Sequence, residues 1–107
     1  MVIIETSIFS KQIQELMHDE AYSEFQNTLA LKPDTGDLIP GGGGLRKIRW
    51  KSHGKGKRGG IWVIYYFLHS DNQLWMIYAY DKSRQENLSK SQLNILKEIV
   101  TRWKHER

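Results

Sequence analysis

The stretch IWVIYYFL, from Ile61 to Leu68, decides the fold of this chain. It is apolar on both of the faces that a strand would present, and it is rich in the β-branched and aromatic residues that strands favour. A strand of this kind is expected in the middle of a sheet, where it is covered on either side. We therefore predict that residues 61–68 form the central strand.

Two flanking stretches predict strands that pair with the central one. Residues 45–51 alternate between apolar side chains on one face, among them Ile48 and Trp50, and cations on the other. The cations are Lys47, Arg49 and Lys51. Residues 74–80 form a third β-rich run after a short turn. Because the connections are short, we predict an antiparallel meander of three strands.

Apolar residues outside this meander recur at helical spacing. A first helix is predicted around Ile13. A second helix begins at the cap Asp19 and ends before Pro33. A third helix follows Ser89 and Gln92, which fit a capping box. The recurring apolar positions are Phe9, Ile13, Leu16 and Met17, then Tyr22, Phe25 and Leu29, and finally Leu93, Leu96, Val100 and Trp103.

These elements together predict an α+β fold. A short apolar strand at residues 2–4 gives the order β-α-α-β-β-β-α, with helices packed on one face of a mostly antiparallel four-stranded sheet. Residues 33–44, which contain two prolines and a run of glycines, are predicted to be turns without a regular element. Because 107 residues suit one hydrophobic core, residues 1–107 are predicted to form a single domain.

The composition, 39% hydrophobic and 26% charged, is that of a folded protein. The chain has no cysteine, which excludes disulfides and thiolate zinc sites. Its four histidines lack the spacing that places two imidazoles on one helical face, so we expect no metal and no cofactor. No run approaches the roughly 20 apolar residues of a membrane span. We therefore expect a cytoplasmic protein with no membrane partner.

Positive charge is concentrated in one part of the sequence. The net charge is +4, yet residues 38–70 contain no Asp or Glu, and the remaining nine Lys and Arg are outnumbered by twelve Asp and Glu. The cations of the basic stretch are Arg46, Lys47, Arg49, Lys51, Lys55, Lys57 and Arg58. Such segregation favours a polyanionic partner, because phosphates attract cations and release counterions on binding. The alternatives are a solvated cationic loop or lysines that protect a sheet edge.

Aromatic, histidine and glycine residues near the basic stretch allow further interpretations. Trp62 can stack on a nucleic-acid base, although most rings in these strands are expected to fill the core. His53 can exchange a proton near neutral pH, or it is simply an exposed loop histidine. The run Gly41–Gly44 leads into a strand, whereas a nucleotide-binding loop leads into a helix, so we interpret it as a turn.

The basic strand, the basic glycine-rich loop and the strand that follows them resemble the RelE/HigB toxins of the RelE/ParE superfamily, and most closely their HigB-like branch. The segments that carry the resemblance are Gly44-Leu-Arg-Lys-Ile-Arg, Gly54-Lys-Gly-Lys-Arg-Gly-Gly, Val63-Ile-Tyr-Tyr-Phe and Tyr80-Asp-Lys. The resemblance spans nearly the whole chain. It implies the RelE-like toxin fold and the toxin component of a type II toxin–antitoxin system.

The resemblance also implies an activity and two partners. The activity is that of a ribosome-dependent endonuclease that cuts messenger RNA in the decoding site, inhibits translation and is silenced by a cognate antitoxin. Family members cleave by attack of the ribose 2′-hydroxyl on the adjacent phosphate, without a metal. This reaction needs a base for the 2′-hydroxyl, positive charge for the phosphorane and an acid for the leaving 5′-oxygen.

Lysine and arginine residues are the candidates for these roles. Lys47 and Arg49 match the paired basic positions of the family, and Lys82 matches a basic position after the last strand. Lys47 is the candidate base, because neighbouring cations and partial burial lower a lysine's pKa. Arg49 would hold the scissile phosphate, and Lys82 would stabilise charge or act as the acid. The candidate RNA-binding residues are Arg46, Lys51, His53, Lys55, Lys57, Trp62 and Arg84.

Two positions depart from the family pattern. Trp62 stands where many relatives have an arginine, and Arg58 is the candidate to supply that catalytic phosphate contact instead. Leu88 stands where RelE itself has a catalytic tyrosine, as is usual in the HigB-like branch. Proton transfer by a tyrosine is therefore excluded at that position.

Two other functions stay open at the level of the sequence. A ParE-like gyrase inhibitor shares the fold and needs no catalytic lysine, so its toxicity would persist without Lys47 and Lys82. A non-catalytic RNA-binding module would use the same basic face for phosphate contacts alone. It would bind RNA in a salt-dependent way and leave the message intact.

Overall fold

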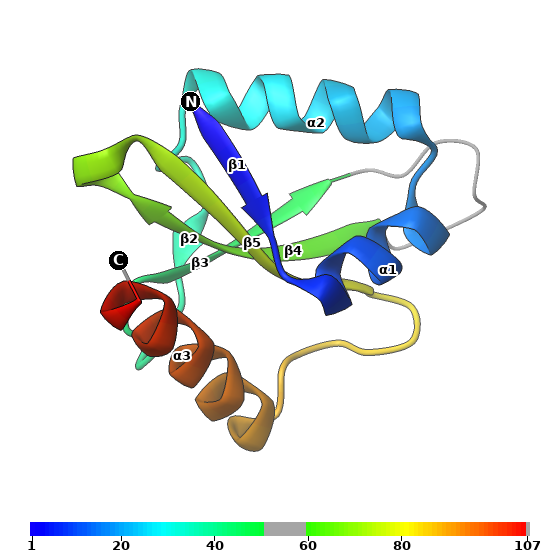
Figure 1. The fold of residues 1–107 in the computed structure, drawn as a ribbon. Coiled ribbons are helices and arrows are strands. Elements are labelled where there is room, and N and C mark those ends of the chain that lie inside the picture. Colours follow the sequence, from blue (N-terminus) through cyan, green and yellow to red (C-terminus); the bar gives the residue numbers. More distant parts are fainter. Residues whose placement is uncertain (51–59, 107) are drawn as a thin grey trace.

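A mixed five-stranded sheet with helices on both sides forms the molecule (Figure 1). The structure is a computed structural model that describes residues 1–50 and 60–106. The helices are α1 (Ser7–Leu16), α2 (Asp19–Leu31) and α3 (Lys90–His105). The strands are β1 (Val2–Glu5), β2 (Asp37–Leu38), β3 (Leu45–Trp50), β4 (Ile61–Leu68) and β5 (Gln73–Asp81). A 3₁₀ turn, η1 (His69–Asp71), joins β4 to β5. The α+β class is therefore confirmed.

The strands lie in the order β1-β5-β4-β3-β2. The predicted antiparallel meander of β3, β4 and β5 is confirmed, and β1 pairs with β5 in parallel. Four buried residues of β4 are less than 1% exposed, which confirms the prediction of a central strand. They are Ile61, Val63, Ile64 and Tyr65.

The prediction of turns alone in residues 33–44, and with it the count of four strands, is wrong. Asp37 and Leu38 form the short strand β2, which pairs with β3 opposite Lys47 and Arg46. The glycine run makes the tight turn between the two strands, because Gly43 (φ 64°) and Gly44 (φ 101°) adopt left-handed backbone conformations. The chain can therefore reverse and pair with itself.

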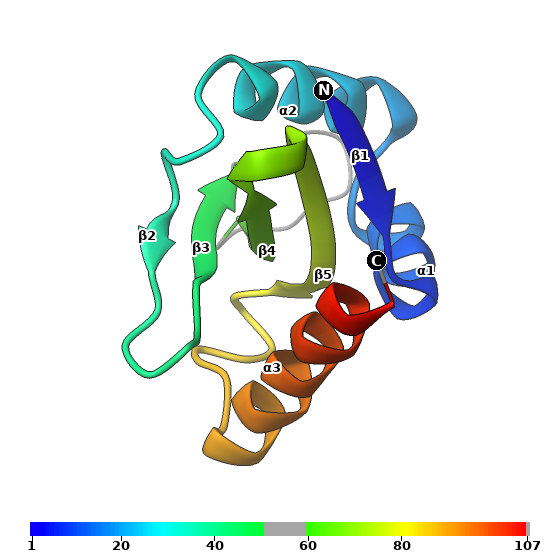
Figure 2. The ribbon, with the colours of Figure 1, turned by 60° about the vertical axis from the view of Figure 1, so that its left-hand side comes forward.

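The helices cover both faces of the sheet, so the prediction that they cover one face is wrong. Helices α1 and α2 lie on one side and α3 on the other, as Figure 2 shows after a rotation. The physical reason lies in β4 and β5, which are apolar on both faces and would expose one apolar face to water if all helices packed on the other.

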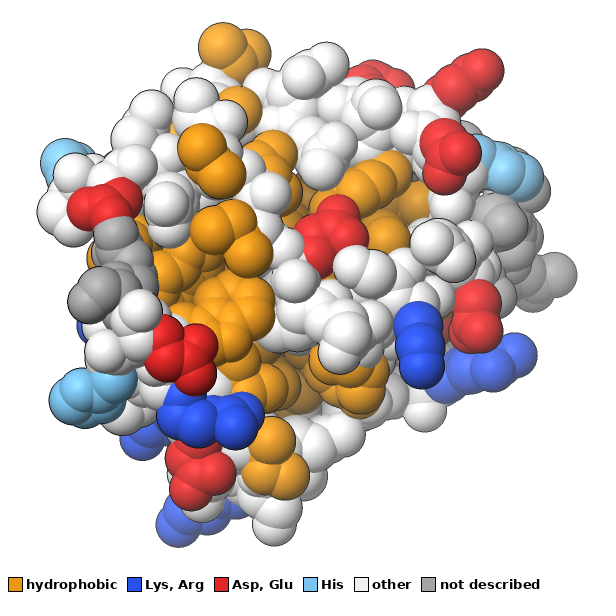
Figure 3. All heavy atoms as spheres, viewed as in Figure 1, with side chains coloured by type: hydrophobic (Ala, Val, Ile, Leu, Met, Phe, Trp, Pro, Cys, Tyr) orange, Lys and Arg blue, Asp and Glu red, His pale blue; other side chains and the backbone are white. Residues whose placement is uncertain are grey.

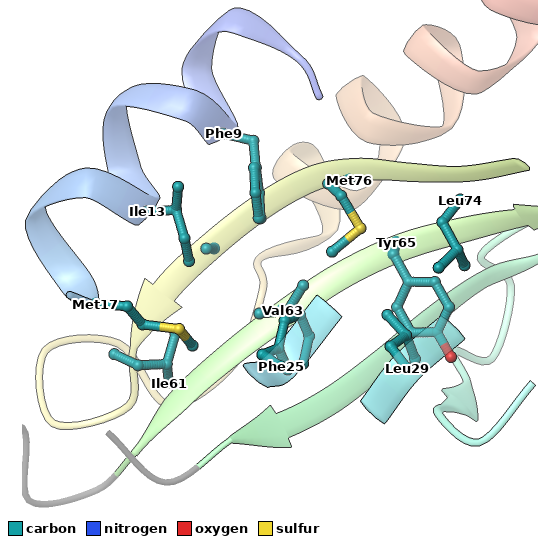
Figure 4. Close-up of a cluster of buried hydrophobic side chains, with 11 residues drawn as sticks. Phe9, Ile13, Met17, Phe25, Leu29, Ile61, Val63, Tyr65, Leu74 and Met76 are labelled. Carbon is teal, nitrogen blue, oxygen red and sulfur yellow. The ribbon is translucent and has the colours of Figure 1, made fainter. Parts of the chain in front are cut away.

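Each side of the sheet has its own core. The core under α1 and α2 contains the residues of Figure 4 and Ala79, and they come from both helices, β4 and β5. The core under α3 contains Leu45, Ile64, Trp75, Ile77, Tyr80, Leu96 and Val100. At the outer end of this second core, Trp103 of α3 meets Trp75 edge to face, with ring centroids 5.4 Å apart. Hydrophobic side chains also gather between β1 and α3 on the surface that Figure 3 shows, where Ile4 and Trp103 line a pocket.

A bulge in β5 changes which of its side chains face each core. Ile64 pairs with Tyr78 and the next residue of β4, Tyr65, pairs with Met76, so Ile77 is an extra residue. Before the bulge, Met76 packs under α1 and α2; after it, Tyr80 packs under α3. The bulge therefore places both Tyr78 and Tyr80 on the side of α3.

Side chains of the first helix and its cap satisfy the backbone around this bulge. The hydroxyl of Thr6, the N-cap of α1, donates to the carbonyl of Ile77 at 2.8 Å. The side-chain oxygen of Gln12 accepts from the backbone N–H of Ala79 at 2.8 Å. These bonds matter because β1 ends at Glu5, so this part of β5 is paired with β4 on one side and has no strand beside it on the other.

Of the two helix caps predicted from the sequence, one is confirmed and one is wrong. The capping box of Ser89 and Gln92 at the start of α3 is confirmed. The N-cap of α2 is His18, which makes no side-chain capping bond, and Asp19 is the first helical residue. The cap predicted at Asp19 is therefore wrong by one position. Within the described part of the chain, none of the helices is long and apolar enough to span a membrane.

Candidate active site

Trp62 lies at the centre of a cationic group on the α3 side of the sheet. In the register of the strands, it stands opposite Arg49 on β3 and opposite Tyr80 on β5. Residues that are directly opposite in antiparallel strands point to the same face, so these three side chains form one row across the sheet. Lys47, Ile64 and Tyr78 form the next row.

Two lysines approach the ring of Trp62. The ammonium of Lys47 lies 4.3 Å from the ring centroid, and that of Lys82, just after β5, lies 5.6 Å from it. Both distances are within the range of cation–π attraction, which offsets part of the repulsion between the two ammonium groups. The structure thus brings Lys47, Arg49 and Lys82 together around one tryptophan.

Lys47 is the lysine whose titration is altered by this arrangement. Partial burial lowers the pKa of Lys47 below its ordinary value, and the positive charge of Lys82 lowers this pKa further. Its ammonium also donates to the side-chain oxygen of Asn87 at 3.4 Å, a long hydrogen bond. A lysine with a lowered pKa is neutral more often at physiological pH, and only a neutral lysine can accept a proton.

Two polar atoms are buried beside the lysines without a hydrogen-bond partner in residues 1–50 and 60–106. They are the indole nitrogen of Trp62 and the hydroxyl of Tyr80. Burial, and to a smaller extent the neighbouring Tyr78, raises the pKa of Tyr80 to about 12. The phenol of Tyr80 therefore stays neutral at physiological pH.

The turn after β5 fixes the position of Lys82. The carboxylate of Asp81, which is buried, accepts from the backbone N–H and the hydroxyl of Ser83 at 2.9 and 2.8 Å. The backbone N–H of Lys82 donates to the carbonyl of Gly60 at 3.3 Å. Lys82 is thereby tied to the start of β4, close to Trp62.

The family model of the RelE toxin of the RelE/RelB toxin–antitoxin system matches residues 3–106. The chain belongs to the RelE toxin family. It is therefore the toxin of a toxin–antitoxin pair, and its partner is a cognate antitoxin. Toxins of the RelE family generally inhibit translation as endoribonucleases.

Among the other predicted site residues of this RelE-family toxin, Arg46 and Arg84 lie in the described part of the chain and five lie outside it. Arg46 points to the opposite face, where its guanidinium donates to the carbonyls of Asp34 and Gly36 at 3.0 and 2.8 Å. Arg84 is exposed in the turn after β5. The predicted residues outside the described part of the chain are Lys51, His53, Lys55, Lys57 and Arg58.

Sequence reasoning missed two residues of the site in this toxin. Asn87 lies 40 positions after Lys47 in a segment without periodicity, so no local pattern connects the two. Tyr80 was expected to belong to the core, which it does, but it lies in the same row as Trp62, and its hydroxyl has no hydrogen-bond partner among the residues that the structure describes. The position of each of these residues in the site depends on how β5 pairs with β4, which no local sequence pattern reveals.

Proposed function

We propose that this toxin is a ribosome-dependent messenger-RNA endonuclease that cleaves without a metal. The observation that carries the proposal is that Lys47 and Lys82 both approach the ring of Trp62, with Arg49 opposite it on β3. Burial and Lys82 also lower the pKa of Lys47. The three side chains supply the base, the positive charge and the acid that the reaction needs. The substrate would be message in the decoding site of a cytoplasmic ribosome.

In this mechanism the RNA supplies its own nucleophile. Neutral Lys47 takes the proton of a ribose 2′-hydroxyl, and the 2′-oxygen attacks the adjacent phosphorus. Arg49 and Lys82 neutralise the charge that develops on the phosphorane oxygens. The bond to the 5′-oxygen breaks, and the leaving oxygen takes a proton from Lys82. The products are a 2′,3′-cyclic phosphate and a free 5′-hydroxyl.

We further propose that the toxin belongs to the HigB-like branch, since Leu88 stands where RelE has a tyrosine. Leu88 packs against the core under α3, one residue before the cap Ser89. An apolar side chain cannot transfer a proton, and in the proposed mechanism both the acid and the base are lysines. The proposed site leaves out Arg46, whose guanidinium holds the turn before β2.

The decisive experiment is primer extension on ribosome-bound message after brief induction of the toxin. We expect cuts in the presence of the unaltered chain and about 10²- to 10⁴-fold less cutting with Lys47→Ala, the usual loss for a general base. Lys11→Ala, an exposed lysine of α1, is the matched control and should cut normally.

Other outcomes would replace the proposal. Growth arrest that persists in Lys47→Ala and Lys82→Ala, with intact message, would point to a ParE-like gyrase inhibitor. Salt-dependent RNA binding by the unaltered chain with no cutting would select the non-catalytic RNA-binding module.

A further inference from the structure

A pocket of about 310 Å³ opens beside Lys47, at the β2–β3 edge of the sheet. Figure 2 shows the two strands of this edge. Leu38, Ile39 and Pro40, from β2 and the turn after it, form one part of its lining. Leu88 and Leu93, at the start of α3, form another. The volume is at the lower end of the range of about 300–1,000 Å³ that small-ligand sites span.

The pocket also has three polar side chains, which are Lys47, Asp37 and Asn87. The side-chain oxygen of Asn87 accepts from Lys47, so its amide N–H groups remain as donors. The carboxylate of Asp37 is an acceptor. An apolar lining with a few polar groups of both kinds suits a planar ring whose edge carries donors and acceptors.

We propose that this pocket binds one unpaired nucleobase of the RNA, the base of a nucleotide that adjoins the scissile phosphate. Bases in single strands are recognised in this way, with apolar contact on the ring and hydrogen bonds along its edge. The inference rests on the proposed function and adds a specificity site to it.

Lys47 places the base next to the bond that is cut. The same ammonium lies over Trp62 and donates to Asn87 in the pocket. A nucleotide whose base fills the pocket therefore has its ribose and phosphate within reach of Lys47. Holding the base would also orient the 2′-hydroxyl for attack, which is a large part of catalysis.

An apolar side chain of a protein partner fits the pocket less well. Such a side chain would cover Asp37, Asn87 and Lys47 without offering them hydrogen bonds, and burying unpaired polar groups costs free energy. A nucleobase would pair with them. The chemistry of the lining thus favours RNA over a docked leucine or phenylalanine.

The test compares two pairs of matched variants on ribosome-bound message. Ile39→Ala and Asn87→Ala alter the pocket, whereas Ile95→Ala and Asn94→Ala remove exposed residues of the same types outside it. Sequencing the ends of the cut message gives the base frequencies on either side of each cut. We expect the unaltered toxin to prefer certain bases at one flanking position, and both pocket variants to weaken that preference by about tenfold. The two controls should keep it.

A second measurement does not depend on cutting. Trinucleotides of DNA lack the 2′-hydroxyl and cannot be cleaved, so we would titrate them into toxin with labelled leucine methyl groups and follow the resonances by NMR. Shifts of Leu88 and Leu93, with Leu31 unchanged, support the nucleobase site even if the toxin cuts no message, in which case only the proposed function fails.

Either of two results overturns the inference. One is an unchanged base preference in both pocket variants. If these variants also lose affinity for the antitoxin, the pocket is a protein-docking site instead. The other is the absence of methyl shifts at Leu88 and Leu93 at trinucleotide concentrations that saturate the toxin.

Discussion

Lys47 shows how a single residue acquires its chemistry from its surroundings. The alternation of β3 puts its side chain on the α3 face, and the pairing with β4 and β5 puts it beside Trp62 and Lys82. Burial and a like charge both disfavour the ammonium form, so both lower its pKa. An isolated lysine on an edge strand would have neither influence.

Removing the charge of Lys82 should raise the pKa of Lys47. Lys82→Met abolishes the repulsion that disfavours the ammonium of Lys47, so the neutral base appears only at higher pH. We expect an upward shift in the pKa of Lys47 in an NMR titration of the lysine ε-carbons. Lys11→Met should leave the titration unchanged. Equal titration of Lys47 in both variants would show that the two ammonium groups do not interact.

Gly44 is a residue at which backbone conformation and close packing act together. It has a φ of 101°, and a Cβ atom there would lie 2.7 Å from Cε2 of Tyr66. Gly41 also has a positive φ, of 70°, but a Cβ atom would meet nothing within 4 Å. The two glycines therefore separate backbone strain from steric clash.

Gly44→Ala should destabilise the toxin more than Gly41→Ala does. Both variants pay for a left-handed alanine, about 1–2 kcal/mol, but only Gly44→Ala also forces Tyr66 to move, at a further cost of about 1–3 kcal/mol. Urea unfolding of the two variants and the unaltered chain measures the difference. Equal midpoints would mean that Tyr66 moves aside freely.

At the scale of elements, the bulge in β5 decides the composition of the site. Without the bulge, regular alternation from Met76 through Ile77 onward would turn Tyr80 toward α1 and α2. The hydrogen bonds from Thr6 and Gln12 hold the bulge, so the first helix shapes the opposite face of the sheet.

Gln12→Ala should lower the free energy of unfolding by about 1–3 kcal/mol, because the N–H of Ala79 loses its partner in a buried position. Lys11→Ala, one residue earlier and exposed, should stay within about 0.5 kcal/mol of the unaltered chain. Denaturant unfolding measures both. The prediction fails if the two substitutions have the same effect.

At the scale of the whole molecule, charge is divided between the two sides of the sheet. The cations around Trp62 lie on the side of α3, whereas α2, on the other side, begins with Asp19 and Glu20 and also carries Glu24. RNA is therefore expected to approach the α3 side, since like charges repel it from the other.

The salt dependence of RNA binding should reveal whether phosphates contact the cations on the α3 side of the sheet. Each phosphate contact that is lost reduces the slope of log affinity against log salt by about 0.7 for a single strand. Arg49→Ala should show that reduction in fluorescence-anisotropy titrations, and Lys11→Ala should not. A slope that is unchanged in Arg49→Ala would place the phosphate contacts elsewhere.

Much of the fold was predictable because its signals are local. The apolar run of β4 and the alternation of β3 each follow from the geometry of one strand. The helical spacing of Phe9 and Ile13 in α1, and that of Val100 and Trp103 in α3, likewise follow from the geometry of one helix. Alternation alone also predicts that Lys47 and Arg49 share one face, whereas the position of Lys82 beside them was expected only from the family resemblance.

The sequence by itself thus determined the central strand, the meander, the helices and the segregation of charge. Tertiary structure alone decided the strand β2, the coverage of both faces, the shift of register at Ile77 and the meeting of Asn87 with Lys47. The physical reason is the distance along the chain over which the deciding interactions act. Periodicity is fixed by neighbouring residues, whereas a bulge, a short edge strand and a pocket wall depend on pairings between segments that are far apart along the chain.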